Sequence, residues 1–152
     1  MDFNTKVIHG GQTLDPSTGA IMTPIYQTST FAQTSPGVDK GYEYSRTSNP
    51  TRTALENSLA SIENGNFGLA FASGVAAIDA VIKLLKPGDE VISTNDLYGG
   101  TFRLFTKIFQ RYGIQFHFVG MENAEHIEKY INKNTKMIWV ETPTNPMLNI
   151  ID

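Results

Sequence analysis

The chain has 152 residues, of which 40% are hydrophobic and 18% are charged, and its formal net charge at pH 7 is -3. A chain of this length can bury roughly two thirds of its unfolded surface, so we expect a folded domain and not a disordered tail. Acidic and basic residues are interspersed, which gives no electrostatic case for binding nucleic acid or an anionic membrane. The absence of cysteine excludes disulfides, thiolate zinc sites and a cysteine nucleophile.

The first residues lack the basic and apolar regions of a secretory signal, and no apolar run is long enough to span a bilayer. A chain without cysteine also suits a reducing compartment. We therefore expect a cytoplasmic protein that works on small molecules.

Residues 1–48 carry turn signals and short β-prone pieces, such as residues 25–31, without a long amphipathic period. Irregular segments of this length are mostly functional or packed on something else. We therefore expect residues 1–48 to form an extended arm that reaches a neighbouring subunit.

A different pattern begins at residue 49. Asn49 can cap a helix whose first position is Pro50, and apolar residues recur at helical spacing up to Ile62. The pair Asn64 and Gly65 then provides the stop signal. The sequence predicts a helix between these limits.

From residue 68 on, short apolar runs alternate with helical patterns. Strands are predicted at residues 68–72, 91–93, 115–119 and 136–141, and helices at residues 75–86, 101–112 and 124–132. The helix at 101–112 would place Phe102, Phe105, Phe109 and Tyr112 on one face. Alternating strands and helices with short connections predict a parallel α/β sheet. Because the chain stops after the fourth predicted strand and its turn, we expect residues 49–152 to be the first part of a larger domain.

Ligands of an open parallel sheet bind outside the carboxyl ends of its strands. Ser73 and Gly74 follow the first predicted strand, where free N–H groups of the next helix could hold an anion. The dinucleotide and Walker A patterns are absent, so a plain tight turn is the simpler local interpretation of this pair.

Three further candidates follow later strands. Tyr98 precedes two glycines that permit close approach, so its ring could stack on a flat cofactor or fill a gap between helix and sheet. Glu141 and Asn145 lie beside two prolines, where they could orient a heteroaromatic ring or an amino acid, or simply form the turn. The three histidines have no metal-ligand spacing and no triad partner, so no metal site is predicted.

Six segments, in this order, resemble the transsulfuration enzymes, the Cys/Met-metabolism group of pyridoxal phosphate (PLP) enzymes. The segments are TKVIHGG (5–11), PIYQTSTF (24–31), YEYSRTSNPTR (42–52), GLAFASGVAAI (68–78), DLYGGTFRLF (96–105) and ETPTNP (141–146). The resemblance implies an α/β fold of PLP-dependent transferase type I, like aspartate aminotransferase, with PLP as cofactor. Three of the motifs are most similar to cystathionine γ-synthase and γ-lyase, and less to cystathionine β-lyase.

The resemblance also implies how the phosphate of PLP is held. Ser73, Gly74 and Val75 would cradle it through backbone N–H groups, although many family members have methionine at the position of Val75. Tyr44 and Arg46 would reach the phosphate in a neighbouring subunit, where a guanidinium can present paired donors. The protein would then be a homodimer that shares active sites, assembled further into a tetramer.

On the ring of PLP, the resemblance implies that Tyr98 stacks and helps to move protons or assist the leaving group. Asn145 would touch the phenolic oxygen, and Glu141 would support the same turn. The family's cofactor-binding lysine, the aspartate paired with the pyridine nitrogen and the arginine for the substrate carboxylate belong to segments beyond ETPTNP. We therefore expect this chain to be the N-terminal part of a longer enzyme and inactive alone.

The implied reaction is γ-replacement or γ-elimination in methionine and cysteine biosynthesis. A γ-synthase would join an O-acylhomoserine to cysteine, and a γ-lyase would cleave cystathionine. A methionine γ-lyase or an O-acylhomoserine sulfhydrylase is a further option within the family. Outside it, the chain could be a non-catalytic module that binds a phosphorylated ligand or a partner subunit, or an α/β domain with a decayed site.

Overall fold

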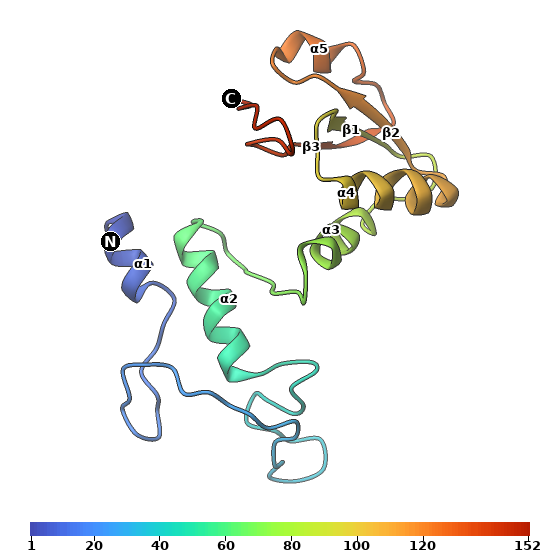
Figure 1. Cartoon of the computed structure of the whole chain (residues 1–152). Helices are drawn as coiled ribbons and strands as arrows, with labels where there is room; N and C mark the ends of the chain where they lie inside the picture. Colours follow the sequence, from blue (N-terminus) through green and yellow to red (C-terminus); the bar gives the residue numbers. More distant parts are fainter. The chain divides into compact units, whose positions relative to one another are not determined.

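The computed structural model describes residues 1–152, which divide into two compact units, Met1–Ala70 (unit 1) and Phe71–Asp152 (unit 2). Figure 1 follows the chain through both units from blue to red. Unit 1 contains helices α1 (Phe3–His9) and α2 (Pro50–Ile62), and unit 2 contains the remaining elements. Neither unit has a helix with the length and apolar character that a membrane crossing requires.

Helix α2 begins and ends as the sequence predicts. The Asn49 side chain accepts a hydrogen bond from the N–H of Thr51 at 2.9 Å, and Pro50 occupies the first helical position. Asn49 also donates from its amide nitrogen to the carbonyl oxygen of Tyr26 at 3.0 Å. The cap therefore fastens the preceding arm to the helix that follows it.

Helix α1 corrects the expectation that residues 1–48 are extended throughout. Its seven residues are too few to display a helical period, and none of them is buried. Contact with α2 stabilises so short a helix. The turn that follows requires glycine, because Gly11 has φ +70° and a Cβ there would lie 2.2 Å from the carbonyl oxygen of Asn57 in α2.

The rest of the arm is held by isolated pairings and does not form a strand at residues 25–31. Thr30 and Tyr44 make an antiparallel bridge. Asp15 is buried, and hydrogen bonds, first of all from the Ser17 hydroxyl, hold the pKa of its carboxyl well below the ordinary value. That the arm reaches a neighbouring subunit stays a prediction.

Unit 2 is built on a three-stranded parallel sheet in the order β2-β1-β3, which confirms the predicted parallel α/β architecture. The strands are β1 (Glu90–Thr94), β2 (Gln115–Val119) and β3 (Thr135–Trp139). All five residues of the central strand β1 are buried. A strand that is covered on both faces is typical of parallel sheets.

The core of unit 2 lies on both faces of β1, because successive side chains of a strand point in opposite directions. On the face of Val91, Phe105 is fully buried and stacks on Phe116 with ring centroids 4.4 Å apart. The rings of Trp139 and Phe105 form a T-shaped pair on the same side, with their centroids 5.7 Å apart. A smaller cluster lies on the other face and consists of Ile92, Val119 and Met121.

The predicted strand at residues 68–72 is wrong. These residues pair with no strand, and the side chains of Leu69 and Phe71 are 76% and 45% exposed. A strand requires a neighbour for its backbone groups, and here the N–H of Ala70 donates instead to the Glu56 carboxylate at 2.9 Å. An apolar run by itself does not supply that neighbour.

The single helix predicted at residues 101–112 is also corrected. The chain forms α4 (Gly99–Arg103), then a π-helical turn (Leu104–Ile108), then a 3₁₀ turn (Phe109–Tyr112). A π turn widens the helical repeat and a 3₁₀ turn tightens it, so the four aromatic residues do not share one face. Phe105 and Phe109 are buried, whereas Phe102 and Tyr112 are 44% and 66% exposed.

Two other helices are shorter than predicted. Helix α3 (Gly74–Ile82) ends at residue 82 and not 86, and helix α5 (Ala124–Glu128) ends at residue 128 and not 132. After each helix the backbone continues with hydrogen bonds between residues three apart. They run from Leu85 N–H to the carbonyl oxygen of Ile82 and from Tyr130 N–H to that of Ile127. Terminal carbonyl groups of helices are often satisfied in this way. Strand β3 begins one residue earlier and ends two residues earlier than the predicted range.

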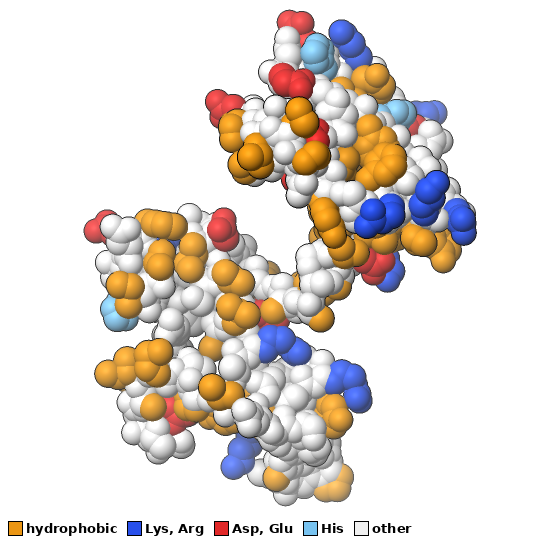
Figure 2. Space-filling model, viewed as in Figure 1, with side chains coloured by type: hydrophobic (Ala, Val, Ile, Leu, Met, Phe, Trp, Pro, Cys, Tyr) orange, Lys and Arg blue, Asp and Glu red, His pale blue; other side chains and the backbone are white.

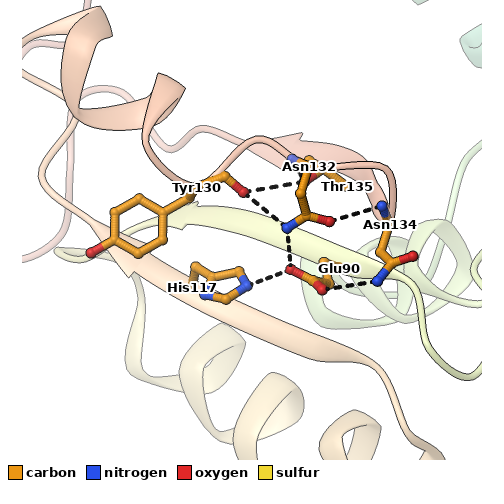
Figure 3. A network of polar contacts seen from close by, with 6 residues as sticks. All are labelled: Glu90, His117, Tyr130, Asn132, Asn134 and Thr135. Carbon is orange, nitrogen blue, oxygen red and sulfur yellow. Dashed lines mark hydrogen bonds and ion pairs between the residues drawn. The ribbon is translucent and has the colours of Figure 1, made fainter.

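A polar network joins the amino end of β1 to the segment before β3 (Figure 3). The Glu90 carboxylate is buried and accepts hydrogen bonds from Asn132 at 2.9 Å and Asn134 at 3.3 Å. His117 of β2 lies 2.7 Å from the same carboxylate. These bonds, first of all the one from Asn132, hold the pKa of the Glu90 carboxyl below its ordinary value.

We expect the Glu90 network to make the stability of unit 2 depend on pH. Because the pKa of Glu90 is lower in the folded state, its contribution is present above the unfolded pKa of about 4.5 and is lost as the pH falls through the folded pKa. Urea unfolding between about pH 6 and pH 3 should therefore show a smaller loss of stability for Glu90→Gln than for the unchanged chain. Glu128→Gln, at an exposed position without a side-chain hydrogen bond, is the control. Equal pH dependence in all three proteins would contradict this role.

Candidate functional site

The chain leaves β1 and β3 at the same edge of the sheet, because the two strands are paired in parallel. Two loops begin there, the β1 loop (residues 95–98) and the β3 loop (residues 140–151). They carry three of the predicted site residues, Tyr98, Glu141 and Asn145. Parallel sheets bind their ligands at this edge.

Glu141 connects the β3 loop to the β1 loop. Its two carboxylate oxygens accept hydrogen bonds from the backbone N–H of Tyr98 at 3.1 and 3.2 Å. The sequence led us to expect Glu141 to support the turn of Asn145, and the structure places it on the backbone of Tyr98. Its contact is with the loop that carries the candidate stacking ring.

Asp96 makes a second connection, in the opposite direction. One carboxylate oxygen, Oδ2, accepts hydrogen bonds from the Thr144 hydroxyl at 2.5 Å and from the backbone N–H of Met147 at 3.0 Å. Thr144 is buried, and its hydroxyl oxygen accepts from the N–H of Asn149 at 2.8 Å. The sequence reasoning gave Asp96 no role. Its place two residues after the buried strand β1 is the signal that could have found it.

The ring of Tyr98 lies across Gly100. A Cβ built on Gly100 would come within 2.3 Å of Cε1 in that ring, whereas one on Gly99 would meet only the far end of Arg103 at 3.4 Å. The sequence predicts that the two glycines permit close approach, and at Gly100 the approaching group is the side chain of Tyr98. The side chain is 46% exposed, so one part of it remains available to a ligand.

Asn145 lies between the two residues that Asp96 holds, Thr144 and Met147. Its side chain is exposed and makes no hydrogen bond within the chain. A free amide at a fixed position can both donate and accept a hydrogen bond. Asn145 therefore has the chemistry expected of a group that contacts the polar edge of a ligand.

Helix α3 begins with two unused backbone donors. Ser73 is its N-cap, and the Ser73 side-chain oxygen accepts from the N–H of Ala76 at 3.1 Å. The N–H groups of Gly74 and Val75 make no hydrogen bond within the chain. A Cβ on Gly74 would meet no atom within 4 Å, so this end of the helix is open to an anion.

Tyr44 and Arg46 lie in unit 1 and contact each other. The guanidinium carbon of Arg46 is 4.4 Å from the centre of the Tyr44 ring. The Arg46 side chain is exposed and forms no ion pair with a carboxylate of this chain. Its donors are thus free, while the aromatic contact restricts where they point.

The comparisons with known proteins agree on one family. Residues 4–152 match the model of the Cys/Met metabolism PLP-dependent enzymes. The chain is 51% identical over 151 residues to a cystathionine beta-lyase of Coxiella burnetii, covering 99% of this chain and 39% of the relative. It is 50% identical over 150 residues to a cystathionine gamma-synthase of Mycobacterium tuberculosis, covering 97% of this chain and 39% of the relative.

A solved structure agrees as well. The cystathionine gamma-lyase of Lactobacillus plantarum complexed with L-serine superposes with a TM-score of 0.92 and 49% identity, over 99% of this chain and 39% of that one. The chain thus spans about two fifths of the length of each protein that it matches. Three enzyme names at nearly equal identity fix the family and leave the reaction open.

The contact between Gly100 and the Tyr98 ring predicts a difference between two adjacent substitutions. Gly100→Ala should displace the ring, and Gly99→Ala should leave it in place, since only the first new Cβ would overlap the ring. Both substitutions lie in the first turn of α4, so the change in helix propensity should be similar for the two. NMR of ring-labelled tyrosine, assigned with Tyr98→Phe, measures the displacement. Equal shifts in both variants would show that the ring does not rest on Gly100.

Proposed function

Because the chain belongs to the family of Cys/Met metabolism PLP-dependent enzymes, we propose that its protein catalyses γ-replacement or γ-elimination on a sulfur amino acid. The supporting observation is the pair of free N–H groups at Gly74 and Val75, which fit the phosphate of PLP. The bound cofactor would supply an electron sink, and the protein would position it and manage protons. We place this activity in the cytoplasm.

The phosphate would be held at the start of α3. Gly74 and Val75 would donate backbone N–H groups, and the hydroxyl hydrogen of Ser73 is free to donate because only its oxygen serves the cap. Since the contacts of Val75 are main-chain contacts, a valine serves there as well as a larger residue. The positive end of the helix dipole adds to the attraction.

Two side chains would act on the ring of PLP. Tyr98 would stack on it and move a proton or assist the leaving group, with its backbone held by Glu141. Asn145 would hydrogen-bond the phenolic oxygen. Both side chains belong to loops at the carboxyl ends of adjacent strands, which supports their acting on one ligand.

We further propose that Tyr44 and Arg46 serve the phosphate of a neighbouring subunit. The exposed guanidinium of Arg46 without an acidic partner supports this role. Apolar side chains at the surface of unit 1 support a partner that covers them (Figure 2). Among them, Met22, Ile25 and Phe67 are 78%, 76% and 90% exposed. The assembly would be a homodimer with shared active sites, or a tetramer of two such dimers.

The substrates would be cystathionine for a γ-lyase, or an O-acylhomoserine with cysteine for a γ-synthase. To test the proposal, the product of the complete gene is purified, its visible absorption is recorded, and cystathionine formation and cleavage are assayed side by side. We expect a visible band from bound PLP and at least one of the two activities. A protein that shows no such band after incubation with PLP would contradict the proposal.

The Arg46 assignment makes its own prediction. In the complete protein, Arg46→Ala should raise the dissociation constant of PLP by tenfold or more, because a charge-assisted hydrogen bond contributes roughly 1.5–3 kcal/mol. Arg46→Lys should recover only part of this loss, since lysine cannot present two parallel donors. Arg111→Ala, on the 3₁₀ turn after α4, is the control and should leave PLP binding unchanged. An unchanged dissociation constant in Arg46→Ala would remove Arg46 from the site.

A further inference from the structure

We propose that Asp96 is a positioning residue, whose carboxylate fixes Asn145 against the cofactor while Glu141 fixes Tyr98. The inference rests on the proposed function, because it concerns the same PLP site. Asp96 itself would touch neither substrate nor cofactor. It would act through the β3 loop.

The contacts of Asp96 surround Asn145 in the sequence. The same oxygen, Oδ2, accepts from the hydroxyl of Thr144, one residue before Asn145, and from the backbone N–H of Met147, two residues after it. Asn145 therefore lies on an arc of chain whose two ends are held by a single atom. A backbone fixed on both sides leaves the Asn145 side chain little freedom other than its own rotamers.

The β3 loop needs this support because it contains no helix or strand of its own. Its internal hydrogen bonds close it upon itself, from Thr144 N–H to the carbonyl oxygen of Asn149 at 2.9 Å and from Leu148 N–H to that of Thr144 at 3.1 Å. These bonds give the loop a shape but do not fix its place on the sheet. The bonds to Asp96 join that shape to the end of the buried strand β1.

The two carboxylates form reciprocal ties. Glu141, which belongs to the β3 loop, holds the backbone of the β1 loop at Tyr98. Asp96, which belongs to the β1 loop, holds the β3 loop on both sides of Asn145. Each loop thus carries one candidate cofactor contact and one carboxylate that positions the contact of the other loop. Neither carboxylate forms an ion pair within the chain, so their partners are hydrogen-bond donors alone.

The test uses the complete protein and four substitutions at Asp96 and Thr144, the two side chains that join the loops. Asp96→Ala removes both bonds, and Asp96→Asn removes the charge while it keeps the shape. Thr144→Val removes the hydroxyl, and Thr144→Ser restores it as a rescue variant. Asp89→Asn is the matched control, because this half-buried carboxylate also accepts a backbone N–H, from Lys86 at 2.8 Å, but at the other end of β1.

Three readouts are recorded for each variant. They are the hydrogen exchange of the Met147 amide without PLP, the dissociation constant of PLP, and the absorption maximum of bound PLP with its dependence on pH. We expect Asp96→Ala and Thr144→Val to speed the Met147 exchange and to weaken PLP binding by about tenfold. Both should shift the absorption maximum or its pH dependence, and Thr144→Ser and Asp89→Asn should resemble the unchanged protein.

A double variant shows whether Asp96 acts through Asn145. If it does, adding Asp96→Ala to Asn145→Ala should change neither the absorption maximum nor its pH dependence any further. Two results with Asp96→Ala and Thr144→Val would overturn the inference: faster exchange at Met147 with unchanged PLP affinity and absorption, or unchanged exchange at Met147. Additive effects in the double variant would also overturn it. If the unchanged protein binds no PLP, the proposed function is contradicted. The role of Asp96 is then contradicted as well, because the PLP site that it would position does not exist.

Discussion

The pairing of β1 with β3 is the constraint on which unit 2 depends, and carboxylates fasten it at both ends. At the amino end, Glu90 of β1 accepts hydrogen bonds from Asn132 and Asn134, just before β3. At the carboxyl end, Asp96 holds the loop that follows β3, through Thr144 and the backbone of Met147. Since β1 is buried along its whole length, these ties fix the two loops relative to the core.

The two ends of this strand pair differ in what they leave free. At the amino end, the amide groups of Asn132 and Asn134 and the imidazole of His117 all contact the Glu90 carboxylate (Figure 3). At the carboxyl end, the carboxylates of Asp96 and Glu141 accept hydrogen bonds from the opposite loop, but the side chains of Tyr98 and Asn145 remain exposed. The same type of interaction therefore closes one edge of the sheet and presents functional groups at the other.

Much of this arrangement could be predicted from the sequence, because local chemistry determines it. The cap of Asn49, the strand at Gln115–Val119 and the parallel sheet follow from capping preference and apolar alternation. The free N–H groups after Ser73 follow from the rule that a helix start leaves donors unused. The six sequence motifs, found in the order typical of the family, predict the family, and the comparisons confirm it.

The errors arose where distant contacts or backbone details decide the outcome. Residues 68–72 are apolar enough for a strand, but no neighbour pairs with them in this chain. The π turn at Leu104–Ile108 moves Phe102 and Tyr112 off the face that a regular helix would give them. Asp96 and Thr144 are 48 residues apart, so no local pattern could indicate their bond. Glu141 follows β3 in the sequence, but its hydrogen-bond partner, the backbone N–H of Tyr98, is 43 residues away and is apparent only in the fold.

The central claim is that the start of α3 holds the phosphate of PLP, and hydrogen exchange of the complete protein tests it most directly. Exchange of the Gly74 and Val75 amides is compared with no ligand, with PLP and with pyridoxal, which has the same ring but no phosphate. We predict that PLP slows exchange at both amides and that pyridoxal at equal concentration does not. Equal protection by the two compounds, or none by PLP, would contradict the account.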